Sequence, residues 1–184
     1  MLSYVVLAIL AILIIAVITI YNRMVKLRNT VQSSWSDIDV QLKKRFDLVP
    51  SLVETVKAYA KHEREVFEKV TEARSMAMQG GSPQQMAKSE NMFRDTLKSL
   101  FAVAENYPEL KANQNFLQLQ GQFQQLEDAI ESARRYYNAV VRDFNTSMQT
   151  FPAVIFAAML GFKPAEFFEL ESPEERKPIR PDFS

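Results

Sequence analysis

A run of nineteen uncharged residues, 2–20, constrains this chain more than any other feature. It reads LSYVVLAILAILIIAVITI. At about 1.5 Å per residue, a helix of this length crosses a hydrocarbon core of roughly 30 Å. All 22 Lys and Arg and all 22 Asp and Glu side chains follow it, beginning with Arg23. The sequence therefore predicts a transmembrane helix at residues 1–22 and a polar domain after it.

The flanks of the run favour an anchor that is not cleaved. Nothing basic precedes Leu2, the exit at residues 18–22 lacks the small residues of a signal-peptidase site, and the chain has no cysteine for a lipid anchor. Three basic residues follow the run before the first acid, Asp37, and these are Arg23, Lys26 and Arg28. Because Lys and Arg beside a span favour the cytoplasmic side, we expect the N-terminus outside and the domain in the cytoplasm.

The composition of the remaining chain predicts one all-α domain at residues 23–171. The formal net charge is zero, so the chain has little electrostatic attraction for nucleic acid, and we expect no nucleic-acid partner. Four glycines and long helical periodicities leave no room for a series of hairpins or βαβ units. Residues 172–184 place three prolines among charges and predict a flexible tail.

Apolar residues at spacings of three and four predict two long helical stripes joined by a shorter helix. The first stripe begins at Ile20 and continues to Gly80-Gly81, with a kink or a break expected near Pro50. Ser82-Pro83 is a helix start, and that helix ends before Pro108. The last begins near Asn113 and ends at Pro152. Two long stripes joined by a shorter helix favour an antiparallel up-and-down bundle.

Motifs for catalysis are missing from the sequence. The single histidine, His62, belongs to no Glu-x-x-His or His-Glu-x-x-His motif. The chain has no Gly-x-Ser-x-Gly motif and no cysteine nucleophile, and Gly80-Gly81 lacks the lysine of a phosphate-binding loop. We therefore expect no enzyme, no cofactor and no metal site, with a metal site made of carboxylates alone as the weaker alternative.

Charged residues on or beside the apolar stripes form the first candidate site. Asp39 occupies a position where the first stripe requires a hydrophobe, and antiparallel packing could bring it to the arginines of the last helix. A buried charge there must be paired, so the group is either a structural ion pair or a cleft that recognises a partner. The members are Asp39, Arg45, Asp47, Glu54, Arg134 and Arg135.

Two further segments are candidate assembly surfaces. Gln118, Gln122 and Gln125 share one helix face, which is either solvated or a source of amide hydrogen bonds between subunits. Residues 153–160 are apolar but too short to span a bilayer. They form either a buried helix that caps the bundle or an exposed surface for a subunit or for lipid. The members singled out there are Ile155, Phe156, Met159 and Leu160.

Residues 21–168 carry, in order, a series of segments that resembles the LemA family. The segments are Tyr21-Asn22, LRN (27–29), WSDIDVQL (35–42), FDLVP (46–50), LVETVK (52–57), Ala73-Arg74, LFAVAE (100–105), YPELKAN (107–113), NFL (115–117), ARRYYN (133–138), Phe144-Asn145, Phe151-Pro152 and Gly161-Phe162. The departures are conservative, such as Phe46 and Val49 where related chains often have Tyr and Ile.

This resemblance implies a protein of the bacterial cytoplasmic (inner) membrane with one span and a four-helix up-and-down bundle. It implies a homo-oligomer or partner-binding protein, with membrane proteases or TPM-domain membrane proteins as possible partners in envelope maintenance. It brings no catalytic residues. We therefore expect a membrane-anchored scaffold or adaptor that contacts membrane lipid. Two alternatives remain: an oligomer that shapes membranes by pressing apolar segments into lipid, and a metal-dependent enzyme that uses carboxylates.

Overall fold

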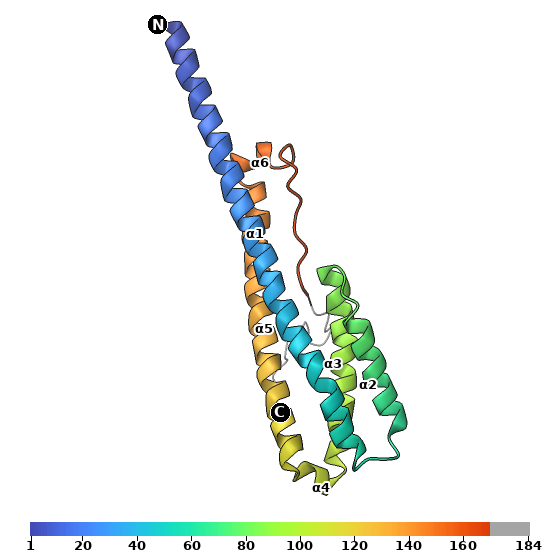
Figure 1. The fold of residues 1–184 in the computed structure, drawn as a ribbon. Coiled ribbons are helices and arrows are strands. Elements are labelled where there is room, and N and C mark those ends of the chain that lie inside the picture. The colour runs from blue at the N-terminus through green and yellow to red at the C-terminus, as the bar shows by residue number, and fades with distance from the viewer. Residues whose placement is uncertain (170–184) are drawn as a thin grey trace, which may run out of the picture. The chain divides into compact units, whose positions relative to one another are not determined.

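The structure is a computed structural model that describes residues 1–169, in which every regular element is a helix (Figure 1). The predicted tail at 172–184 lies outside these residues. The elements are α1 (Leu2–Lys57), α2 (Arg64–Ala77), α3 (Pro83–Glu105), α4 (Pro108–Lys111), α5 (Gln114–Gln149) and α6 (Ala153–Phe156). The all-α prediction is confirmed. By their internal contacts the described residues divide into two compact units, one of residues 1–42 and 127–167, the other of residues 43–126 and 168–169.

In the first unit the N-terminal part of α1 packs against the C-terminal part of α5. The rings of Trp35 and Tyr137 lie 5.3 Å apart, and Tyr21, nearer the N-terminus of α1, meets Phe162, which follows α5, at 5.8 Å. The two helices are therefore antiparallel. Within the described chain, α1 is the one helix long and apolar enough to cross a membrane, and none of its most apolar stretch is buried. This supports the predicted anchor.

The α1 stripe differs from the prediction at Asp39, whereas its predicted members Met24, Val31 and Leu42 are buried. Asp39, assigned to the stripe, is exposed, whereas its neighbour Ile38 is 0% exposed. Met24, Val31 and Ile38 recur every seventh residue in the core. The predicted stripe passed from Trp35 to Asp39. Ile38 and Asp39 follow Trp35 by three and four residues, so the spacing fits both, and the charge of Asp39 was not taken as a reason to choose Ile38.

The first stripe was predicted to continue to Gly80-Gly81 with a kink or a break near Pro50, but the helix ends elsewhere. Helix α1 continues without a break through Pro50 and ends at Lys57, and α2 begins at Arg64. The apolar spacing persists across the turn because α2 also buries one face, including Phe67 and Val70. Residues 58–63 contain no glycine or proline, so no local signal marked the reversal.

The second unit contains the antiparallel pair α2 and α3 and the helix starts predicted from local motifs. Ser82 and Gln85 form a capping box, with the Gln85 amide donating to Ser82 Oγ and the Ser82 amide donating to Gln85 Oε1. Asn113 Oδ1 accepts from the amides of Asn115 and Phe116 at 2.9 and 3.2 Å, which begins α5. Both predicted starts are confirmed. The short α4, between α3 and α5, was not predicted.

Candidate functional site

A buried ion pair lies in the core of the second unit. Arg45 of α1 donates to Glu90 of α3, and both side chains are almost fully buried. The guanidinium carbon of Arg45 lies 5.1 Å from the ring centre of Phe93 and 5.9 Å from that of Phe46, and the two rings are 5.3 Å apart. A cation so enclosed is stabilised by its carboxylate and by the ring faces. This pair holds α1 and α3 in register.

The sequence identified Arg45 but not its partner. Glu90 follows Met86 by four residues and precedes Phe93 by three, so it interrupts the apolar stripe of α3 as a buried acid would. Of the other predicted charged residues, Asp39, Asp47 and Glu54 are exposed, and Arg134 is half-buried. Arg135 pairs with Glu131 one turn earlier on its own helix. Arg45 therefore contributes to a structural pair, with α3 supplying the acid.

Arg74 of α2 also reaches α1. Its Nε donates to the backbone carbonyl oxygen of Phe46 at 2.7 Å. In a regular helix this oxygen would accept from the amide of residue 50, but Pro50 has no N–H. The side chain of Arg74 therefore supplies the hydrogen bond that Pro50 cannot.

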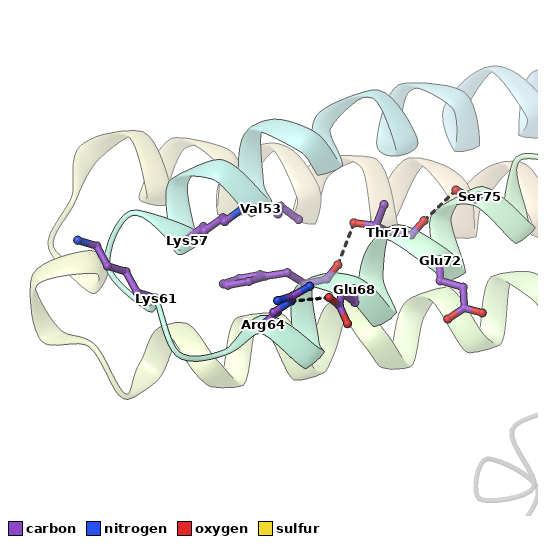
Figure 2. Close-up of a pocket in the computed structure, with 9 residues that line it drawn as sticks. Val53, Lys57, Lys61, Arg64, Glu68, Thr71, Glu72 and Ser75 are labelled. Carbon is purple, nitrogen blue, oxygen red and sulfur yellow. Dashed lines mark hydrogen bonds and ion pairs between the residues drawn. The ribbon is translucent and has the colours of Figure 1, made fainter.

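A groove of about 820 Å³ lies between the last turns of α1 and the length of α2 (Figure 2). Lys57 and Lys61 lie toward one end, Glu72 and Ser75 toward the other, and Arg64 lies between them. The other lining residues are Val53, Phe67, Glu68 and Thr71. The groove thus offers an apolar floor with basic and acidic side chains along it, a combination suited to a peptide carrying both charges.

Ion pairs along α2 organise this surface. Arg64 Nε donates to Glu68 Oε1 at 2.7 Å, and this hydrogen bond raises the pKa of Arg64 above its ordinary value. Lys69 lies 2.6 Å from Glu65 Oε1, and its hydrogen bond lowers the pKa of that carboxyl. The hydroxyls of Thr71 and Ser75 donate to backbone carbonyls of their own helix. Lys57 and Lys61 supply the positive charge at the α1 end.

A polar clamp in the first unit fixes the segment after α6. Asn145 Nδ2 donates to the carbonyl of Ala165 at 2.9 Å, and its Oδ1 accepts from the Ala165 amide at 2.8 Å. The Tyr137 hydroxyl donates to the carbonyl of Glu166 at 2.8 Å. Burial, and then the nearby carboxylate of Glu166, raise the pKa of Tyr137 to about 12. We refer to Tyr137 and Asn145 as the clamp.

The described residues offer no metal centre, since residues 1–169 hold no group of three or more His, Asp or Glu side chains placed to share an ion. His62 lies in the turn between α1 and α2 and is exposed to solvent. The surfaces with distinctive chemistry are therefore the groove and the segment around α6.

Comparison with known proteins identifies the family. A model described as "LemA family" matches residues 34–183. The chain belongs to the LemA family. This LemA-family chain is 24% identical over 185 residues to magnetosome protein MamQ 2 of Paramagnetospirillum magneticum, covering 86% of this chain and 68% of that protein. It is 23% identical to magnetosome protein MamQ of Magnetospirillum gryphiswaldense, with the same coverage. It is 28% identical over 134 residues to protein LemA of Metamycoplasma hominis, covering 71% and 60%.

The segments that carry the LemA resemblance include both residues of the clamp. Tyr137 lies in ARRYYN, and Asn145 directly follows Phe144. Gly161 has a φ of 78°, a conformation that glycine adopts readily, and it leads into the buried Phe162. In the sequence Asn145 stood out only through the resemblance, because it lies on no charged or catalytic pattern. Their function in this LemA-family chain is to hold the C-terminal segment against α5.

The predicted assembly residues of the LemA-family chain have different environments. Gln118 and Gln125 are exposed and Gln122 is half-buried. Helix α6 has no buried residue, so the prediction of a buried capping helix was wrong. Ile155 and Met159 are exposed, while Phe156 and Leu160 are half-buried. The segment has only one helical turn, too little to bury a face, and its other predicted role as an exposed surface stays open.

Proposed function

We propose that this LemA-family protein is a membrane-anchored scaffold that binds a protein partner at the groove and assembles with copies of itself. The observation that carries the proposal is the continuity of α1. One uninterrupted helix contains both the apolar run at residues 2–20 and two groove residues, Val53 and Lys57. A partner bound there would be held by the same helix that crosses the membrane.

The chemistry of the groove supports binding rather than catalysis. Its charges are already organised by neighbours, such as Arg64 by Glu68, and its hydroxyls donate to backbone carbonyls. We therefore propose no enzymatic activity. The basic residues after the span favour a domain in the cytoplasm of a bacterial cell, with the N-terminus outside. There, membrane proteases and TPM-domain membrane proteins are the proposed partners, in envelope maintenance.

Self-assembly is proposed through the glutamine face of α5. Gln118 and Gln125 are exposed, and the nearby Leu117 is 49% exposed. Amide groups beside an exposed aliphatic side chain can form hydrogen bonds and apolar contacts with a second copy. Crosslinks that join these residues in two subunits would support this face.

The test is crosslinking of the full-length protein in native membranes, with products identified by mass spectrometry. The double variant Lys57→Glu/Lys61→Glu reverses the charge at one end of the groove. Lys88→Glu makes the same change at an exposed position of α3 that does not line the groove. We expect the double variant to lose the crosslink to a foreign partner and the Lys88 variant to keep it. Equal crosslinking in both would exclude the groove as the partner site.

The exposed apolar side chains around α6 favour a second candidate function, the shaping of membranes by oligomers. This function predicts that full-length protein, reconstituted at rising density, narrows or tubulates liposomes seen by electron microscopy. Vesicles of unchanged diameter would reject it and leave the scaffold proposal untouched.

A further inference from the structure

Large apolar side chains are exposed together between the end of α5 and Gly161. Phe151 is 80% exposed, Met159 82%, Val154 50% and Ile155 52%. We call these four residues the apolar tip. They fall within nine consecutive positions, and no acidic or basic residue lies among those positions. Contiguous apolar exposure of this kind marks a surface that contacts another apolar phase.

The apolar tip lies beside the last part of the apolar run of α1. Phe162, directly after the tip and Gly161, packs its ring 5.8 Å from that of Tyr21. The guanidinium of Arg28 lies 5.4 Å from the centre of the same ring. Figure 1 shows α6 beside α1 at this level. Residues 2–15 of α1 are exposed throughout, whereas Ala16, Val17 and Ile20 are half-buried. The fold therefore holds the tip where the predicted span leaves the bilayer.

This position is fixed by named contacts. Phe162 is buried between Tyr21 and Phe144, whose ring lies 6.4 Å away. The clamp then ties Ala165 and Glu166 to α5 by three hydrogen bonds. A segment held from both α1 and α5 cannot withdraw easily from the end of the span.

The side chains around the tip match the chemistry of a lipid interface. Tyr21 is 43% exposed, and Phe151 adds a second exposed aromatic ring, as in the aromatic belts of membrane proteins. Arg23, Lys26 and Lys163 are exposed and basic. Such residues attract anionic headgroups, while the apolar side chains reach the acyl region.

We propose that the apolar tip inserts into the headgroup–acyl boundary of the membrane that α1 spans. The protein then has two membrane contacts, the span and the tip, and the second restricts how the first unit tilts and rotates about α1. This inference rests on the proposed anchoring by α1. A second copy of the chain is the other possible occupant of the tip, and the experiment below distinguishes it from lipid.

Because the chain has no cysteine, single cysteines can carry an environment-sensitive fluorophore without background labelling. Three variants of the full-length protein are reconstituted in liposomes of zwitterionic and anionic phospholipid: Met159→Cys at the tip, Ile9→Cys in the span and Met92→Cys as a matched control. Met92 is 50% exposed on α3. Quenching by phospholipids that carry a nitroxide on the acyl chain, near the headgroup, reports contact with lipid.

We expect strong quenching at Ile9 and Met159 and several-fold weaker quenching at Met92. Quenching at Ile9 with none at Met159 would overturn the tip proposal while keeping the anchor. No quenching at Ile9 would instead overturn the proposed anchoring. A third outcome is a label at Met159 whose emission is shifted to the blue but is not quenched, with energy transfer between labelled copies. This outcome would assign the tip to a contact between subunits and would also overturn the lipid proposal.

Discussion

Arg74 hydrogen-bonds the backbone of Phe46, whose carbonyl oxygen is left without its helical donor by Pro50. A proline inside a helix destabilises it by about 3 kcal/mol, in part through the missing hydrogen bond. Here a side chain from α2 supplies a donor from outside the helix, at 2.7 Å. This interaction helps to explain how α1 remains one helix from Leu2 to Lys57.

Replacement of Arg74 by methionine should therefore destabilise the protein by about 1–2 kcal/mol, because the Phe46 carbonyl loses its donor in a partly buried site. The same substitution in a Pro50→Ala background should cost clearly less, since an alanine in place of the proline restores the backbone N–H. Thermal unfolding of the full-length protein in detergent, followed by circular dichroism, measures this double-mutant cycle. An equal cost in both backgrounds would show that Arg74 acts independently of Pro50.

The ion pair between Arg45 and Glu90 predicts a different pattern. Glu90→Leu should cost about 3–5 kcal/mol, because it leaves a buried guanidinium without its carboxylate. Arg45→Met/Glu90→Leu should recover most of this loss, since the methionine side chain can pack between Phe46 and Phe93. The matched control is Glu131→Leu, which breaks the exposed pair with Arg135 and should not change the melting temperature measurably. A double variant as unstable as Glu90→Leu would show that the charges themselves are required.

Local sequence signals were sufficient for part of this fold. Ser82-Pro83 and Asn113 predicted the starts of α3 and α5 because each cap bonds amides within three residues of itself. The apolar run at residues 2–20 could also be recognised from the sequence, since length and apolarity alone define a candidate span. The turn after Lys57 was missed because its sequence contains no helix breaker.

The site depends on that missed turn. A single helix through residue 79 would have placed Arg74 about 40 Å along the axis from Phe46, which lies 28 residues earlier. Only the reversal before α2 brings them together and opens the groove. Likewise, Glu90 of α3 lies 45 residues after Arg45 of α1. The periodicity within each helix does not predict which residues of two separate helices come into contact. The sequence pattern therefore did not predict the contacts between distant segments.

Tyr137 predicts a pH-dependent contribution to stability. Its pKa is raised from about 10 to about 12, so the folded state holds this proton more tightly than the unfolded state. The contribution is complete below pH 10 and is lost as the pH rises from 10 towards 12. Tyr137→Phe should cost about 1 kcal/mol at pH 8 through the lost bond to Glu166. The difference from wild type should shrink by pH 11.

Trp35 is the single tryptophan and packs on Tyr137, so its fluorescence reports on the surroundings of Tyr137. Its fluorescence follows unfolding of the first unit at each pH, in wild type and in Tyr137→Phe. All other titratable groups are common to both proteins, so their effects cancel in the difference. A difference that stays constant from pH 8 to pH 11 would contradict the raised pKa.

Asn145 provides the test of how the clamp positions the apolar tip. Asn145→Ala removes both hydrogen bonds to Ala165 and should destabilise the first unit by about 2 kcal/mol. In the Met159→Cys protein, the same substitution should lower lipid quenching of the label, because Phe162 and the tip are then held less firmly against α1. Quenching of the label at Ile9 should not change, since α1 alone carries that position. Asn115→Ala, at an exposed position near the start of α5, is the matched control. Undiminished quenching at Met159 in Asn145→Ala would show that the tip stays at the membrane without the clamp, and that Asn145 contributes to stability alone.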